Sequence, residues 1–169
     1  SCLSFNSISY KNVVSNGLVL DKNGQKMSKR LGNTIDPFEM INVYGADTVR
    51  WYMISNSNPW DNLKFDKEGV AEVKRKFFGT LQNVYSFFSL YANIDNFKYE
   101  EDKIDFVKRP ELDRWIISEL NSLVKKVDYN LENYDLTPAA REINDFVQEK
   151  LSNWYVRLSR RRFWNCLLY

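Results

Sequence analysis

The C-terminal part of the chain carries three stretches in which apolar side chains recur every three or four positions, the spacing that places them on one face of an α-helix. They are Val70, Val73, Phe77, Leu81, Val84, Phe88 and Tyr91 in the first stretch, Trp115 or Ile116, Leu120, Leu123, Val127 and Leu131 in the second, and Ile143, Val147, Leu151, Trp154 and Leu158 in the third. A helix with one apolar face must bury that face against another element. The pattern therefore predicts an antiparallel bundle of three helices over residues 65–169.

Helix-start signals separate these stretches. Residues 93–109 are charged and lack periodicity, so we interpret them as a connection, after which Pro110 opens the second helix. Thr137 followed by Pro138 predicts the N-cap and the first residue of the third helix. The short segment 132–136 favours antiparallel packing of the last two helices.

Residues 1–64 have a different pattern, made of short apolar runs and turn signals. Asn-Gly pairs at 16–17 and 23–24 follow the apolar runs at 13–14 and 18–20, which predicts at least one tight β-hairpin. The chain as a whole is expected to be mainly α.

A compact pair of short helices is predicted next. Asp36 has the chemistry of an N-cap, Pro37 suits the first helical position, and Glu39 is placed for a capping box. Gly45 would end this helix, and a second would run from about 46 to 53.

Composition limits the possible functions. The chain has 169 residues, of which 44% are hydrophobic, enough for one substantial core or two modest ones. Its net charge of +2 neither requires nor excludes a nucleic-acid partner. Two cysteines and no histidine exclude a disulfide framework, Ser-His-Asp catalysis and His-containing metal sites, and they favour a reducing, cytoplasmic location. Without a long apolar stretch, we expect no membrane partner.

The run Lys26-Met27-Ser28-Lys29-Arg30 places cations on a short loop between the apolar run at 18–20 and the capped helix. Lysine carries a compact charge on a flexible stem and suits a polyphosphate whose oxygens move during reaction. Gly24 and Gly32 would let the loop close and open. Taken alone, such a run is more often an ordinary solvated turn, so the five residues leave both interpretations open.

The surrounding sequence favours the functional interpretation. The run is preceded by Gly-Leu-Val-Leu-Asp-Lys-Asn-Gly and followed by Leu-Gly-Asn-Thr-Ile-Asp-Pro. Further on, positions 44–51 read Tyr-Gly-Ala-Asp-Thr-Val-Arg-Trp. This ordered set resembles class I aminoacyl-tRNA synthetases of the isoleucyl, valyl, leucyl and methionyl group, with the lysine run as their second ATP signature. Residues 58–66 and 151–164 are most similar to the isoleucyl branch, and the resemblance extends from Tyr10 to Trp164.

The resemblance implies a fold and an activity. Residues 1–64 would be the C-terminal part of a Rossmann-type α/β catalytic domain with its lysine loop and a short helical connector, and 65–169 the anticodon-binding bundle, truncated at its C-terminal end. The family's His-Ile-Gly-His signature needs histidine, so we expect it upstream of this chain. The parent would be an ATP-dependent aminoacyl-tRNA ligase that activates isoleucine and transfers it to tRNA(Ile), and the fragment alone should be inactive.

The same resemblance assigns roles to single residues. Lys29 would be the chief contact to the ATP phosphates and would share the catalytic role with Lys26, while Met27 and Ser28 complete the ATP-binding loop. Arg30 stands at a position where serine is commoner in the family. Arginine at this position is seen in isoleucyl-type sequences. ATP would bring Mg²⁺, for which the fragment offers no ligands, and the isoleucine pocket would lie outside these residues.

A basic strip near the end of the chain predicts contact with the tRNA partner. Its members are Arg157, Arg160, Arg161 and Arg162, with no acidic residue from Trp154 onward. Internal salt bridges with the acidic faces of the helices are the alternative. We expect Trp154 in the core, and Asp47 and Arg50 as a structural ion pair at the joint between the loop and the bundle.

Two rival functions stay open on the sequence alone. A valyl-tRNA synthetase fragment would share the loop and the connector, although serine is usual there at the position of Arg30. A non-catalytic tRNA-binding helical module that kept the loop is the other rival.

Overall fold

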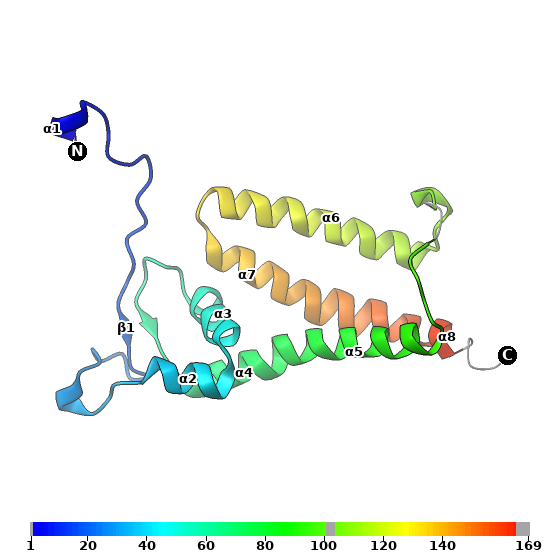
Figure 1. Cartoon of the computed structure of the whole chain (residues 1–169), viewed down its shortest axis with the longest axis horizontal. Helices are drawn as coiled ribbons and strands as arrows, with labels where there is room; N and C mark the ends of the chain where they lie inside the picture. Colours follow the sequence, from blue (N-terminus) through cyan, green and yellow to red (C-terminus); the bar gives the residue numbers. More distant parts are fainter. Residues whose placement is uncertain (1, 101–103, 165–169) are drawn as a thin grey trace.

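The computed structural model describes residues 2–100 and 104–164. Helices dominate, and one small sheet lies at the N-terminal end of the bundle (Figure 1). The first half contains α1 (Cys2–Phe5), β1 (Val19–Leu20), a 3₁₀ turn (Lys29–Leu31), α2 (Pro37–Tyr44), α3 (Ala46–Asn56), β2 (Leu63–Lys64), α4 (Lys67–Val73), a π-helical segment (Lys74–Phe78) and α5 (Gly79–Ile94). The second half contains a 3₁₀ turn (Phe106–Lys108), α6 (Glu111–Glu132), α7 (Leu136–Asp145), a second π-helical segment (Phe146–Val156) and α8 (Arg157–Trp164).

The two strands pair in parallel, with Val19 opposite Leu63 and Leu20 opposite Lys64. The predicted hairpin exists only in minimal form, as an antiparallel bridge between Leu20 and Lys26 across the turn at 23–24. The apolar run at 13–14 does not form a strand. The chain just before β1 pairs instead with a segment far along the sequence, since the Gly17 amide donates to the Pro59 carbonyl at 2.8 Å.

Gly17 is required by this close approach. A Cβ built on Gly17 would lie 2.1 Å from the carbonyl oxygen of Asp61, so any larger residue would push the two segments apart. The amide of Leu18 continues the contact by donating to Asn62 Oδ1 at 2.9 Å.

Helices α2 and α3 form as predicted. Asp36 caps α2 by accepting from the Phe38 amide at 2.9 Å, Pro37 occupies the first turn, and Gly45 ends the helix with a φ of 90°. Glu39 differs from the prediction, since its carboxylate lies 3.7 Å from the Lys67 ammonium and forms an ion pair between α2 and α4.

Three long helices form the bundle. Residues 67–94 make one run of helix from α4 through α5, and residues 136–164 make another from α7 through α8. In Figure 1 the run from α7 to α8 lies between α5 and α6. It is antiparallel to α6 and runs in the same direction as α5. The predicted three-helix bundle is confirmed.

Two apolar cores stabilise the molecule. The first gathers α2, α3 and β2 around the start of the long helix and contains Met40, Val49, Tyr52, Leu63, Phe65 and Val70. The second lies inside the bundle and contains Phe77, Ile116, Phe146 and Val147. The helix from α4 to α5 therefore serves both cores, with Val70 in one and Phe77 in the other. A domain boundary at residue 64 stays a prediction.

The structure corrects two expectations about the third helix. Trp154 and Leu158 are 59% and 54% exposed, so Trp154 is not a core residue. Thr137 is not an N-cap, because its buried hydroxyl donates instead to carbonyls of α3, at 2.7 Å to Ile54 and 2.9 Å to Ser57. Leu120 and Leu131, predicted on the apolar face of the second helix, are also exposed.

Among residues 2–100 and 104–164, no helix is both long and apolar enough to cross a bilayer. The same residues contain no group of three or more side chains suited to hold a metal ion.

Candidate functional site

The lysine loop, residues 21–33, leaves the sheet at the end of β1 and projects from the body of the molecule (Figure 1). Its first turn is closed by two backbone bonds, since the Gly24 amide donates to the Asp21 carbonyl at 2.9 Å and the Asp21 amide donates to the Gln25 carbonyl at 2.9 Å. Gly24 has a φ of 81°, a left-handed conformation that favours glycine. The turn sends Lys26 back alongside Leu20.

The second part of the loop is a single capped 3₁₀ turn. Ser28 is its N-cap, and the Ser28 hydroxyl accepts from the Leu31 amide at 3.3 Å. Gly32 ends the turn with a φ of 65°. Lys29 and Arg30 therefore occupy the first two positions of a defined turn.

The cations of the loop face solvent. Lys26, Lys29 and Arg30 are exposed, and no ion pair joins them to an acidic group within the part of the chain that the structure describes. Met27 is half-buried and packs against the first core. The loop is thus attached by Met27, and its run from Lys26 to Arg30 presents three positive side chains that can meet an anion.

Two polar residues without a role in the sequence interpretation hold the loop in shape. Asp21 is 8% exposed, and its Oδ1 accepts from the amides of Asn23 at 2.9 Å and Gln25 at 2.8 Å. Asn33 Nδ2 donates to Asp21 Oδ2 at 2.9 Å, while Asn33 Oδ1 accepts from the Ser28 amide at 2.8 Å. The Asn33 side chain, followed by these backbone amides, holds the pKa of Asp21 below its ordinary value, so the carboxylate stays ionised and accepts hydrogen bonds. The only sequence signal was their position flanking the lysine run.

A junction between α3 and α7 connects the loop-bearing unit to the bundle. Besides the two Thr137 bonds, Arg141 donates through Nε to the Ser55 carbonyl and through Nη2 to the Asn56 carbonyl, both at 3.0 Å. Four consecutive carbonyls at the end of α3 therefore receive side-chain donors from α7. Such carbonyls have no partner within their own helix, so the contacts stabilise the end of α3 as well as the junction.

Aromatic packing reinforces this junction. The Trp51 ring stacks on Phe77 with 4.6 Å between centroids, and its Nε1 donates to Asn144 Oδ1 at 2.9 Å. Asp47 and Arg50 form the predicted exposed pair at 3.4 Å, a surface contact of modest worth.

The basic end of the bundle divides into two kinds of arginine. Arg162 donates to both carboxylate oxygens of buried Asp113, at 2.6 and 3.0 Å, and Tyr155 donates its hydroxyl to the same carboxylate at 3.0 Å. Arg162 lowers the pKa of Asp113, and Asp113 raises the pKa of Arg162. Arg162 thus makes the internal salt bridge that was the alternative to tRNA contact.

The other arginines of the strip, Arg157, Arg160 and Arg161, are exposed. Within the described residues none of the three forms an ion pair. Lys150, in the π-helical segment before α8, pairs with Glu119 of α6.

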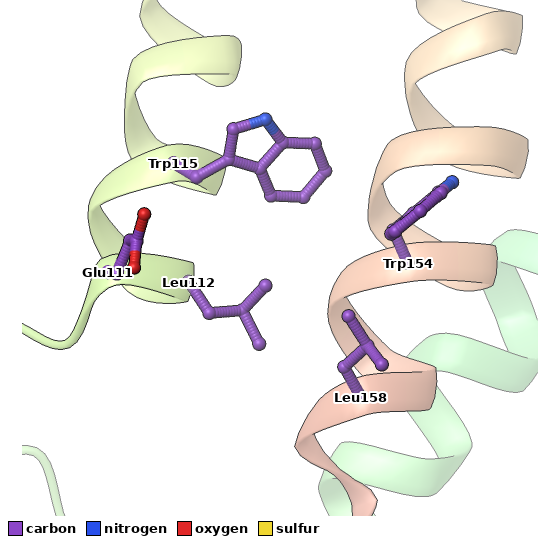
Figure 2. Close-up of a pocket in the computed structure, with 5 residues that line it drawn as sticks. All are labelled: Glu111, Leu112, Trp115, Trp154 and Leu158. Carbon is purple, nitrogen blue, oxygen red and sulfur yellow. The ribbon is translucent and has the colours of Figure 1, made fainter.

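An open apolar groove of about 640 Å³ lies beside this strip. Figure 2 shows Leu112 and Trp115 of α6 on one wall, opposite Trp154 and Leu158 on the other. Glu111 lies at the rim, at the start of α6. The groove explains why Trp154 and Leu158 are exposed although their spacing is typical of a core.

Two family models match the chain. The model of class I tRNA synthetases (I, L, M and V) matches residues 2–66, and the model of the anticodon-binding domain of tRNA ligases matches residues 113–169. The chain belongs to the class I tRNA synthetase family. The first match includes the whole lysine loop, and the second includes the arginines of the basic strip.

Curated relatives of this synthetase segment are named isoleucine–tRNA ligases. That of Porphyromonas gingivalis is 69% identical over 156 residues, covering 92% of the chain and 14% of the relative. That of Bacteroides fragilis is 65% identical over 160 residues, covering 95% and 14%, and that of Clostridium novyi is 50% identical over 161 residues, covering 95% and 15%. The chain therefore spans about one seventh of the length of these relatives.

A solved structure shares the fold of this synthetase segment. It is the ternary complex of the LeuRS of Agrobacterium radiobacter K84 with tRNA and LeuAMS, similar with a TM-score of 0.64 at 23% identity over 88% of this chain and 19% of that one. At this identity the likeness supports the fold alone.

Proposed function

We propose that the chain is a segment of an isoleucine–tRNA ligase and that its lysine loop stabilises the pyrophosphate leaving ATP when isoleucine is activated. The relatives at 69% and 65% identity support the choice of amino acid. The observation that carries the chemistry is the loop itself, which holds Lys26 exposed beside β1 and Lys29 exposed on a capped 3₁₀ turn.

Activation needs positive charge where negative charge develops. The isoleucine carboxylate attacks the α-phosphorus of ATP, the bond to the bridging oxygen breaks, and pyrophosphate leaves with the bonding electrons. Lys29 and Lys26 stabilise the charge that builds on that pyrophosphate, and this interaction is strongest in the transition state. Ser28 and Met27 keep the turn capped and attached to the first core.

The ligands for Mg²⁺ would come from the nucleotide and not from the lysine loop. The lysine loop contains one carboxylate, Asp21, and both of its oxygens already accept hydrogen bonds from protein donors. The metal would be carried by the ATP phosphates and would neutralise part of their charge. In this proposal the chain contributes ammonium groups, and the isoleucine pocket lies in the rest of the protein.

The bundle is proposed to hold the anticodon arm of tRNA(Ile) in the cytoplasm. The match to the anticodon-binding domain supports this role, as do the exposed Arg157, Arg160 and Arg161, which form no ion pair among the described residues. They lie beside a groove lined by exposed Trp154 and half-buried Trp115. Phosphates would meet the arginines, and unpaired bases could stack on Trp115 or Trp154.

The amino-acid dependence of pyrophosphate exchange by the full-length protein tests the proposal. We expect isoleucine to support rapid exchange between pyrophosphate and ATP, and valine to support it about 10²-fold less efficiently, the discrimination that one methylene allows. Charging of tRNA(Ile) should follow the same preference. Exchange that prefers valine would assign the chain to a valyl enzyme. The absence of exchange with either amino acid would leave a non-catalytic RNA-binding module.

A further inference from the structure

The Asn33 side chain spans the open side of the lysine loop and contacts it at three points. Its Nδ2 donates to Asp21 Oδ2 at 2.9 Å and to the Lys26 carbonyl at 3.3 Å, and its Oδ1 accepts from the Ser28 amide at 2.8 Å. The Lys26 carbonyl and the Ser28 amide lie on either side of Met27 in the chain. One amide group therefore fixes the backbone that carries the lysines.

Asp21 gives this contact a rigid base. The residue follows β1 directly, and the neighbouring strand β2 holds β1 in place through bonds such as that from the Phe65 amide to the Leu20 carbonyl at 2.9 Å. With its Oδ1 occupied by two backbone amides, Asp21 can offer only Oδ2 to Asn33. The pair thus joins the sheet to the far side of the loop through one donor and one acceptor.

We propose that Asn33, held by Asp21, is the positioning residue of the lysine loop, which fixes Lys26 and Lys29 for contact with the ATP phosphates. This inference rests on the proposed function. Asn33 touches neither ATP nor isoleucine in this account, and acts through the backbone at Lys26 and Ser28. Misplacement of a cationic group by about 1 Å can cost up to 10²-fold in rate, so a loop released from Asn33 would lose rate while keeping its charges.

Exchanging the two residues provides the sharpest test. Asn33→Asp brings two carboxylates face to face, and Asp21→Asn brings two amide groups face to face because Oδ1 must still serve the amides of Asn23 and Gln25. The double variant Asp21→Asn with Asn33→Asp again places a donor opposite an acceptor. The carboxylate introduced at position 33 can still accept from the Ser28 amide. The double variant loses the long bond to the Lys26 carbonyl, which then faces a carboxylate oxygen in place of an amide donor.

The variants are made in the full-length protein and measured by pyrophosphate exchange. Each single variant should lower kcat by about 10-fold or more with a much smaller change in the KM for ATP, and the double variant should recover to within about threefold of the parent. Tryptic cleavage after Lys26, Lys29 and Arg30 gives a second readout. It should be faster in the single variants and return towards the parent rate in the exchanged pair.

Affinity for tRNA(Ile) separates positioning from folding, because Figure 1 shows the lysine loop and α8 at opposite ends of the molecule. The single variants should bind tRNA as the parent does. Single variants with parental kcat, a double variant no better than the singles, or loss of tRNA binding would each overturn the inference. The proposed function is judged separately, since failure of the parent to exchange with isoleucine would refute it whatever these variants do.

Discussion

Asp113 illustrates how one buried carboxylate can organise the end of a helix bundle. A buried carboxylate is costly unless it is paired and hydrogen-bonded. Arg162 and Tyr155 supply three donors to Asp113, so the start of α6 is tied to the π-helical segment and α8. The contact also orients α8, and with it Arg160 and Arg161. Burial, together with Asp113, raises the pKa of Tyr155, which keeps the phenol protonated as a donor.

Replacing Asp113 should produce a stability loss with a specific pH dependence. Arg162 lowers the pKa of Asp113 in the folded chain, so its contribution is fully present above the unfolded value of about 3.9 and is lost as pH falls through the folded pKa. We expect Asp113→Asn to lower the free energy of unfolding by about 1–3 kcal/mol at pH 7, and by less below about pH 4. Urea unfolding across pH measures this difference.

Asp128→Asn is the matched control, because Asp128 lies exposed on the same helix. It should change the free energy of unfolding by less than about 0.5 kcal/mol throughout. A loss at Asp113 that stayed constant down to pH 2 would contradict the assigned role of its ionised form.

At the scale of the element, α8 presents Arg157, Arg160 and Arg161 to solvent while Arg162 is held by Asp113. If Arg160 and Arg161 contact tRNA phosphates, Arg160→Gln with Arg161→Gln should weaken tRNA(Ile) binding. It should also reduce the slope of log K against log salt by about 1.4–1.8, because each neutralised phosphate contributes about 0.7–0.9 to that slope. Filter binding at several salt concentrations measures both quantities.

The double variant Arg75→Gln with Lys125→Gln removes the same charge from exposed positions elsewhere in the bundle. It should leave the salt slope almost unchanged. Equal slopes for both double variants would show that the effect is one of net charge and would exclude the α8 contact.

Elements governed by neighbouring residues were predictable from the sequence. Asp36 and Pro37 specify the start of α2 within a few residues, and helical periodicity located all three long helices. Elements governed by distant partners were not. β1 pairs with β2 across α2 and α3, and the hydroxyl of Thr137 serves α3 and not its own helix. Trp154 has core spacing, yet it lines an open groove, because spacing specifies a face of the helix but not what covers that face.

In the candidate site, too, local features were predictable from the sequence and contacts between distant residues were not. Lys26 and Lys29 were found from a local run of residues, and the structure shows them exposed on the loop. The sequence marks Asn33 and Asp21 only as residues that flank the run, because a hydrogen bond between side chains twelve positions apart leaves no periodic signal. A role for Arg162 as a salt-bridge partner depended on the position of Asp113 in a different helix.

For the whole molecule, the junction of α3 with α7 determines how the lysine loop and the bundle are related. Thr137 and Arg141 donate to four successive carbonyls of α3, and Tyr52 of the same helix donates to the Lys64 carbonyl of β2 at 3.1 Å. Since β2 pairs with β1, which leads into the loop, a continuous set of polar contacts joins the bundle to the cationic turn. In the proposed ligase this connection would hold the loop at a defined position relative to tRNA bound by the bundle.

The most direct test of the central claim is single-turnover formation of isoleucyl-adenylate by the full-length protein carrying Lys29→Ala. Our account predicts a rate lower by about 10²-fold or more, with the dissociation constant of ATP changed far less, because the lysine acts mainly on the departing pyrophosphate. Lys125→Ala, which removes an exposed lysine of α6, should match the parent. A Lys29→Ala protein that forms adenylate at the parental rate would contradict the account.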